Sequence, residues 1–250
     1  KASVQNTDLV IFRELSGGIY YGDKSISEDQ SSATDTCTYT EAEISRITHL
    51  AFKSARSRKK KVTLVDKANV LETSRLWRRV VRSISESYPD VVLECLFIDN
   101  AAVQMILNPS QFDVILTDNM FGDILSDQGS VIAGSIGLLP SASVGLEHAM
   151  FEPIHGSYPD AKGKNIANPV ASILSMAMLL QHFKMNEESD AVVAAVLKSF
   201  AKKIVTPDIL GSSKYGTNYV GDFIADNIME LDGTFTMNDE NIGLGKSTII

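Results

Sequence analysis

The sequence predicts an α/β fold with a mixed, largely parallel sheet. Short apolar runs, which are typical of buried strands, alternate along the chain with stretches of helical hydrophobic periodicity. This alternation favours parallel strands, because each helix returns the chain to the start of the next strand. No Gly-x-Gly-x-x-Gly motif occurs in the 250 residues, so the fold is not expected to be a Rossmann fold.

The first predicted elements are a strand, a polar arm and an amphipathic helix. Residues 8–15 form an apolar run, and a glycine pair at 17–18 allows a sharp turn after it. Residues 23–38 are polar and lack apolar periodicity, so they are expected to lie outside the core. Thr40 and Glu43 have the spacing of a capping box, which predicts that a helix begins there.

Strands and helices then continue to alternate. Pro89 and Pro109 each end a helix, because proline cannot continue one. Asn168 and Pro169 predict the start of another, with proline at its first position. The tail 231–250 has no clean period and stays unassigned. The further predicted elements are strands at 62–65, 91–98, 112–117 and 140–151, and helices before Pro89, at 101–107, 122–137, 169–182, 187–204 and from Thr217 onward.

Composition limits the functional classes. With 44% hydrophobic residues the chain can bury a sizeable core, and no apolar run approaches the ~18 residues that a membrane span needs. The net charge of −8 argues against nucleic acid or a membrane surface as a partner. The basic cluster 56–61 is expected to close a helix and extend into water. Cys37 and Cys95 are too few for a disulfide scaffold, which fits a reducing cytoplasm.

Two aspartates give the clearest indication of chemistry. Asp123 and Asp127 are four residues apart in a predicted helix, so both carboxylates lie on one face. Like charges held this close repel each other unless a cation lies between them, and Mg²⁺ or Mn²⁺ prefers carboxylate oxygens. The alternative is a solvated helix surface. The preceding strand favours the metal, because open α/β sheets bind ligands where a strand turns into a helix.

Other polar residues follow predicted strands. Lys67 and Asp99 each come after an apolar strand, and parallel neighbours would bring them to one sheet edge. Lys67 could act as a general base if burial and nearby cations favour its neutral form. Tyr20, after the glycine pair, could donate a proton, and Arg13 could bind a carboxylate. The alternatives are a solvent-exposed lysine, a surface tyrosine and an ion pair between Arg13 and Glu14.

The loop 152–169 is the second informative region. It is rich in Gly, Pro and Asn, and it is too long for a plain connection. His155, Asp160 and Asn168 could bind a nucleotide there, with Asp160 accepting hydrogen bonds from ribose hydroxyls. A carboxylate at this place would repel a 2′-phosphate, which favours NAD over NADP. The alternative is an ordinary surface loop.

Four segments together resemble the 3-isopropylmalate dehydrogenases, a branch of the isocitrate/isopropylmalate dehydrogenase family. They keep that family's order and spacing over residues 8–225. The branch is indicated by Leu-Ser-Gly-Gly at 15–18, where isocitrate, homoisocitrate and tartrate enzymes tend to carry Asn-Thr-Glu. The four segments are RELSGGIYYG (13–22), DKANVLETSRLWR (66–78), FGDILSD (121–127) and EPIHGSYPDAKGKNIANP (152–169).

The resemblance implies an oxidoreductase with the two-domain fold of this family. It would carry out NAD-dependent oxidative decarboxylation of 3-isopropylmalate to 4-methyl-2-oxopentanoate and CO₂, a step of leucine biosynthesis in the cytoplasm. Residues 1–133 would form the substrate, metal and dimerisation domain, and residues 134–250 the C-terminal half of the nucleotide-binding domain. A homodimer would form through the arm 22–38 and the helices 101–107 and 122–137.

The resemblance also assigns roles to residues. Tyr20 would protonate the enol left by decarboxylation, and Lys67 would be the base in the partner subunit's site. Asp99 from the partner would join Asp123 and Asp127 around Mg²⁺ or Mn²⁺. The substrate would be bound by Arg13, Asn69 and Val70, and the adenosine half of NAD by His155, Gly156, Ser157, Asp160 and Asn168.

The chain departs from this family at its start. The family begins with a strand, a Gly-rich turn and a helix that bears two further substrate arginines, and no such pattern occurs here. The expectation is therefore a C-terminal fragment that is inactive alone. The alternatives are a tartrate- or homoisocitrate-type decarboxylating dehydrogenase and a non-catalytic dimerising fragment.

Overall fold

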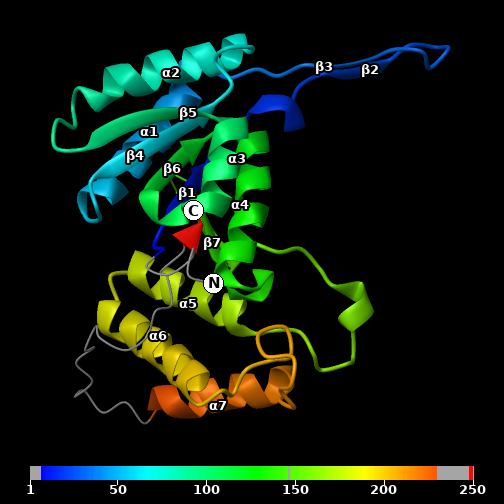
Figure 1. Cartoon of the computed structure of the whole chain (residues 1–250), viewed down its shortest axis with the longest axis vertical. Helices are drawn as coiled ribbons and strands as arrows, with labels where there is room; N and C mark the ends of the chain where they lie inside the picture. The colour runs from blue at the N-terminus through cyan, green and yellow to red at the C-terminus, as the bar shows by residue number, and fades with distance from the viewer. Residues whose placement is uncertain (1–6, 146, 230–247, 250) are drawn as a thin grey trace. The chain divides into compact units, whose positions relative to one another are not determined.

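Four strands of the N-terminal part form a parallel sheet in the order β5-β4-β6-β1 (Figure 1). The computed structural model describes residues 7–145, 147–229 and 248–249, and the chain divides into two units, Lys1–Gly129 and Ser130–Leu244. The predicted parallel α/β arrangement is confirmed. The strands of this sheet are β1 (Val10–Arg13), β4 (Lys61–Asp66), β5 (Val92–Phe97) and β6 (Val114–Thr117).

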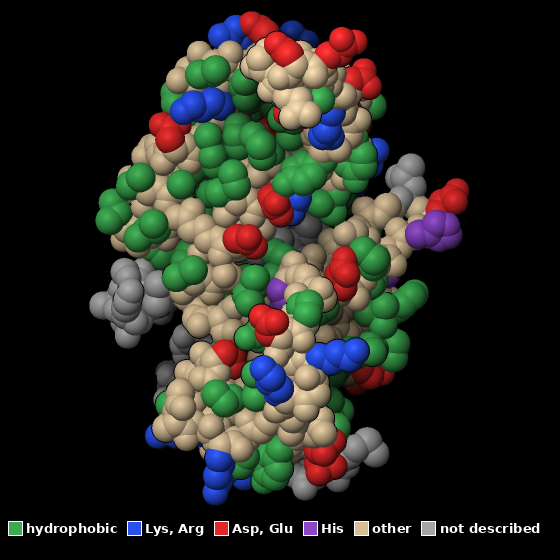
Figure 2. Space-filling model, turned by 90° about the vertical axis from the view of Figure 1, so that its right-hand side faces the viewer, with side chains coloured by type: hydrophobic (Ala, Val, Ile, Leu, Met, Phe, Trp, Pro, Cys, Tyr) green, Lys and Arg blue, Asp and Glu red, His purple; other side chains and the backbone are tan. Residues whose placement is uncertain are grey.

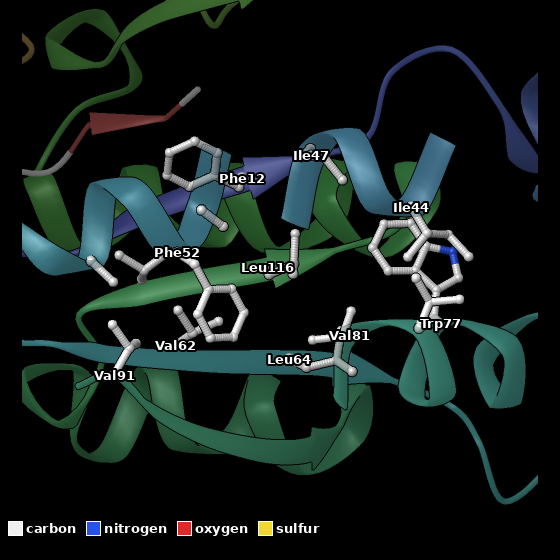
Figure 3. Packing of buried hydrophobic residues seen from close by; sticks show 14 of the residues in the cluster. Phe12, Ile44, Ile47, Phe52, Val62, Leu64, Trp77, Val81, Val91 and Leu116 are labelled. Atoms are coloured by element: carbon white, nitrogen blue, oxygen red, sulfur yellow. The ribbon is translucent and has the colours of Figure 1, made fainter. Parts of the chain in front are cut away.

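Helices pack against this sheet because β1, β4 and β6 are buried on both faces, whereas the edge strand β5 is partly exposed. The helices α1 (Glu41–Arg56) and α2 (Glu72–Ser85) form the main core with β1, β4 and β6 (Figure 3). Successive residues of β1 point to opposite faces, so Phe12 enters this core while Ile11 approaches Gly129 of α4 (Asn119–Ala133). The helix α3 (Ile98–Leu107) follows β5.

The predicted polar arm is a hairpin of two short strands. β2 (Lys24–Ile26) pairs antiparallel with β3 (Ala33–Asp35), and every residue of both strands is exposed. The two strands therefore add nothing to the core of their own unit, whereas Cys37 near the end of the arm packs against it. The capping box that opens α1 forms as predicted, with Thr40 Oγ1 accepting from Glu43 N and the Glu43 carboxylate accepting from Thr40 N.

The second unit combines a hairpin with three helices. The predicted strand 140–151 is two antiparallel strands, β7 (Pro140–Val144) and β8 (Ala149–Pro153), and the two-residue β9 (Thr248–Ile249) pairs in parallel with β7. Apart from β9, the tail 231–250 lies outside the described residues. The helices are α5 (Val170–His182), α6 (Asn186–Ala201) and α7 (Thr217–Met229), and their shared core includes Val170, Ala195, Val196, Val220 and Ile224.

Three helices differ from their predicted bounds by three residues or more, and one of them is α6, which was predicted to end at 204 and ends at Ala201. The predicted helix 122–137 is α4, which begins at Asn119 because the Asp118 carboxylate caps it by accepting from Phe121 N at 2.9 Å. It ends before Gly134, which has a φ of +98° that suits glycine after a helix. The predicted helix 101–107 begins at Ile98, so Asp99 lies in the first turn of α3 rather than at a strand end.

The basic cluster 56–61 does not simply extend into water. Arg58 donates to Asp113 Oδ1 and to Asp8 Oδ1, each at 2.7 Å, and Asp113 is only 1% exposed. Asp113 is buried because it directly precedes the apolar strand β6. A buried carboxylate needs such partners. Among the described residues, no helix combines the length and the apolar character that crossing a bilayer requires.

Candidate active site

Three of the predicted site residues form one hydrogen-bonded cluster in the first unit. Arg13, the last residue of β1, donates from Nη1 to Asp123 Oδ1 at 2.5 Å. Tyr20, at the end of a short 3₁₀ turn (Gly18–Tyr20), donates its hydroxyl to Asp123 Oδ2 at 2.7 Å. The Arg13 guanidinium carbon also lies 5.8 Å from the centre of the Tyr20 ring. A cation, a phenol and a carboxylate therefore meet at the point where β1 ends beside α4.

A residue that the sequence analysis did not select holds Arg13 from the other side. Asn119 Oδ1 accepts from Arg13 Nε at 3.0 Å and from Arg13 Nη2 at 2.8 Å, and Asn119 is 3% exposed. The signal in the sequence is the polar pair Asp118-Asn119 between a buried strand and a helix, a place where open α/β sheets bind ligands.

The turn before Tyr20 is built around two buried side chains. Glu14, 3% exposed, accepts from Gly17 N at 2.8 Å and from Ser16 N at 3.0 Å. The Tyr39 ring lies against the glycine pair, and a Cβ on Gly18 would collide with its hydroxyl. Gly18 also has a φ of +82°, which only glycine adopts readily. The Leu-Ser-Gly-Gly segment is therefore shaped by contacts from elsewhere in the chain.

The pKa values of Tyr20 and Asp118 in this region are shifted. The hydrogen bond to Asp123, with a smaller contribution from burial, raises the pKa of Tyr20, so its phenol stays protonated in a wide pH range. Burial raises the pKa of Asp118 to about 6 despite the hydrogen bond from Phe121 N. The cluster thus offers a protonated donor beside a carboxylate.

Lys67 and Asp99 form a second cluster in the same unit. Lys67 follows β4, and its Nζ donates to Asp99 Oδ1 in the first turn of α3. This hydrogen bond lowers the pKa of Asp99, whose side chain is 66% exposed. Asn69 and Val70, which follow Lys67, are also exposed. The predicted base and the predicted third metal carboxylate therefore come together within one chain.

The metal prediction depends on the carboxylates of α4. Asp123 and Asp127 are one helical turn apart, and their oxygens are hard donors that fit Mg²⁺ or Mn²⁺. Within the described parts of the chain, no group of three or more His, Cys, Asp or Glu side chains could hold a metal ion. A further carboxylate would have to come from outside this group of two.

The second unit contains a cavity of about 660 Å³. Of the five predicted cofactor residues, His155 and Asn168 line this cavity. Gly156, Ser157 and Asp160 do not line it, and all three are exposed. Both ends of the Asn168 amide are used, because Oδ1 accepts from Val170 N and Nδ2 donates to Asp208, each at 3.0 Å. Sequence reasoning missed the rest of the lining, which is Ala167, Pro169, Ser172, Ile173, Thr217, Asn218, Gly221 and Asp222.

Exposed apolar side chains occur on the two helices that follow β5 and β6. On α3 and α4 they are Val103, Ile106, Leu107, Ile124 and Val131, each more than half exposed. Figure 2 shows hydrophobic side chains gathered on one face of the first unit, in the upper half of the view. Such a surface is typical of a protein interface.

Comparisons with known proteins agree on one family. The model of the isocitrate/isopropylmalate dehydrogenase family matches residues 1–224. A 3-isopropylmalate dehydrogenase of Aquifex aeolicus is 49% identical over 93% of this chain and 66% of its own length. One of Moorella thermoacetica is 51% identical over 90% of this chain and 64% of its own length. The chain thus spans about two thirds of the length of these relatives.

Solved structures agree with these sequence matches. The isocitrate dehydrogenase of Methylococcus capsulatus superposes with a TM-score of 0.84 at 36% identity, covering 87% of this chain and 66% of that one. A β-decarboxylating dehydrogenase of Thermococcus kodakarensis gives a TM-score of 0.77 at 36% identity, covering 90% and 67%. The fold is that of isocitrate dehydrogenase-like enzymes and not a Rossmann fold.

Proposed function

The chain belongs to the isocitrate/isopropylmalate dehydrogenase family, and we propose that the protein is an NAD-dependent decarboxylating dehydrogenase acting on 3-isopropylmalate. The products would be 4-methyl-2-oxopentanoate, CO₂ and NADH, in a step of leucine biosynthesis. Relatives that are 49–51% identical to this chain are named 3-isopropylmalate dehydrogenase, which supports this substrate over those of the other family members. The Leu-Ser-Gly-Gly turn at 15–18 supports it as well.

The observation that carries this proposal is the cluster of Arg13, Asp123 and Tyr20. Arg13 would bind a carboxylate of the substrate through a guanidinium that is already held in place. Tyr20 would donate a proton to the carbon from which CO₂ departs, and its hydroxyl lies beside Asp123, one of the carboxylates that would hold the metal. Asn69 and Val70 would line the substrate pocket.

The carboxylates of Asp123 and Asp127 would hold a divalent cation. When bound, Mg²⁺ or Mn²⁺ withdraws electrons from the substrate's 2-oxygen and so favours the loss of CO₂. Asp123 accepts from Arg13 and Tyr20 in this structure, which places its two oxygens beside both groups that would contact the substrate. The carboxylate is 47% exposed, so a ligand can reach it.

A second subunit would complete the site. Lys67 and Asp99, which pair within one chain, would enter the partner's site together, with Lys67 removing the proton of the 2-hydroxyl and Asp99 adding a carboxylate to the metal. The exposed arm 22–38 and the apolar residues of α3 and α4 would form the contacts of a homodimer. Placing base and acid on different chains makes each site depend on both subunits.

The second unit would bind the adenosine half of NAD. Its cavity has room for part of a nucleotide, and His155 and Asn168 contribute to its lining. Gly156 and Ser157 would offer backbone groups from the adjoining loop. Asp160 would accept hydrogen bonds from the ribose, which favours NAD over NADP. When bound, NAD accepts the hydride from C2 of the substrate.

The proposal is tested by an assay of the full-length protein. NADH absorbance is followed with NAD, Mg²⁺ and either 3-isopropylmalate, isocitrate, homoisocitrate or tartrate. The expected result is turnover with 3-isopropylmalate that is lost when the metal is chelated. Faster turnover with one of the other acids would refute the substrate, and no turnover with any of them would refute the activity.

A further inference from the structure

Asn119 is a buried amide at the start of α4 for which the proposed chemistry gives no role. It is 3% exposed, and its side chain joins two segments that are far apart in the sequence. Oδ1 accepts two hydrogen bonds from Arg13, and Nδ2 donates to Gly17 O at 3.2 Å. Its backbone N–H donates to the Tyr39 hydroxyl at 3.0 Å. A residue with this many defined contacts has a defined orientation.

The contacts occupy one edge of the Arg13 guanidinium. Arginine has five N–H donors, and hydrogen bonds to the described residues use three of them: Nε and one from Nη2 to Asn119, and one from Nη1 to Asp123. One N–H therefore remains on each terminal nitrogen. Two adjacent donors of this kind match the two oxygens of a carboxylate.

The two partners of Arg13 differ in charge and in exposure. Asp123 is charged and 47% exposed, and it also accepts from Tyr20, so it can exchange partners when a ligand enters. Asn119 is neutral and buried, so its hydrogen bonds to Arg13 do not depend on what Asp123 binds. A carboxylate at position 119 would form a second ion pair with Arg13 and compete with a substrate carboxylate for its charge.

We propose that Asn119 is a positioning residue that fixes the Arg13 guanidinium without neutralising it, and so leaves its charge for a substrate carboxylate. This inference rests on the proposed function, in which Arg13 binds the substrate. An amide is the side chain that meets both demands of the place. Its oxygen accepts from Arg13, and its nitrogen donates to the Gly17 carbonyl, which a carboxylate could not do.

The test compares two substitutions of Asn119 in the full-length protein. Asn119→Asp keeps the shape of the side chain and adds a charge, whereas Asn119→Ser removes most of the side chain and stays neutral. Calorimetry without NAD measures the Kd of 3-isopropylmalate with Mg²⁺ present, and kinetics give KM and kcat. Asn108→Asp is the matched control, because Asn108 is exposed at the end of α3 and lies outside the cluster.

If charge is what matters, Asn119→Asp weakens substrate binding more than Asn119→Ser. We expect Kd and KM to rise by roughly tenfold or more in Asn119→Asp, the scale of one charge-assisted contact, with a smaller change in kcat and none in the KM for NAD. Asn119→Ser should weaken binding by a few-fold at most, although it removes more contacts. Asn108→Asp should behave as the wild type.

A purely structural role gives the opposite order. Aspartate can still accept from Arg13 and loses only the hydrogen bond to Gly17 O, whereas serine loses the contacts to both, so Asn119→Ser would then bind substrate more weakly than Asn119→Asp. That result overturns the inference while leaving the proposed function intact. Equal affinities of both variants and the wild type overturn it as well. A wild-type protein that does not bind 3-isopropylmalate overturns the proposed function together with the inference.

Discussion

The hydroxyl of Tyr39 occupies the space where a Cβ on Gly18 would have to lie. Tyr39 is 6% exposed and comes from the segment between the arm and α1, whereas Gly18 begins the turn that carries Tyr20. The contact thus connects the proposed proton donor to the core. It also makes the size of residue 18 a property that can be tested.

Gly18→Ala should cost more free energy of unfolding than Gly163→Ala. Both glycines have a positive φ, +82° and +75°, so each substitution adds about 1–2 kcal/mol of backbone strain. Gly163 has open space around it, and only Gly18 meets Tyr39. Denaturant titration should therefore show an additional loss of about 1–3 kcal/mol at Gly18. If Tyr39→Phe does not reduce that additional loss, the contact with the hydroxyl is not its cause.

Arg58→Ala should destabilise the protein by about 3–5 kcal/mol, because it leaves the buried Asp113 carboxylate without its cation. Arg58 bonds to Asp113 and Asp8, which joins the starts of β6 and β1 to the end of α1. The matched control is Arg56→Ala, whose ion pair with Asp90 is exposed, so its loss should change the free energy of unfolding much less. Similar midpoints for both variants in urea would contradict this interpretation.

Asp118→Asn should change how stability depends on pH. Burial raises the pKa of Asp118 from 3.8 to about 6, so the folded state favours the protonated carboxyl. That contribution is present below pH 4 and is lost as the pH rises to about 6, which amounts to about 3 kcal/mol at most. Asparagine does not titrate, so the variant lacks this loss. The unfolding free energy of the variant minus that of the wild type should therefore be larger at pH 7.5 than at pH 4.5. Parallel pH profiles of the unfolding free energy would exclude the effect.

Lys67→Met and Tyr20→Phe should each lower turnover by about 10²–10⁴, as is usual for the loss of a general base or acid. The two inactive variants should regain activity when their subunits are mixed and reassociated. In a mixed dimer one site receives Tyr20 and the partner subunit's Lys67, so roughly a quarter of the wild-type activity is expected from random pairing of subunits in a twofold dimer. If mixing restores nothing, Lys67 acts within its own chain or not at all.

Asp160→Lys combined with Ala161→Tyr should shift cofactor preference from NAD towards NADP. A carboxylate repels a 2′-phosphate, and lysine attracts it. The measurement is the ratio of kcat/KM for the two cofactors in the full-length protein. Lys162 and Lys164 follow closely and could soften the repulsion, so Lys162→Ala serves as the control. A ratio that the double substitution leaves unchanged would show that Asp160 does not contact the ribose.

The sequence was sufficient where the determining contacts are local. The capping box of Thr40 and Glu43 and the apolar strands appear in short windows, so the parallel sheet and the start of α1 were predicted correctly. Contacts between distant segments were missed. Arg58 and Asp113 are 55 residues apart, and Arg13 and Asn119 are 106 residues apart, so no local pattern indicates either pair. The predicted start of α4 at residue 122 was wrong because the Asp118 carboxylate caps the helix, which begins at Asn119.

The strand ends around Arg13 also limit how this part of the protein can change. Arg13 of β1 and Val65 of β4 are both paired in register with Thr117 of β6, so the three strands finish at one level. Deleting a single residue within β1 would shift the residues after it by one position, which moves Arg13 to the core position of Phe12 and Glu14 to the position of Arg13. Insertions and deletions should therefore be tolerated in the arm 22–38 and not in β1. Sequence changes around Arg13 are then limited to substitutions.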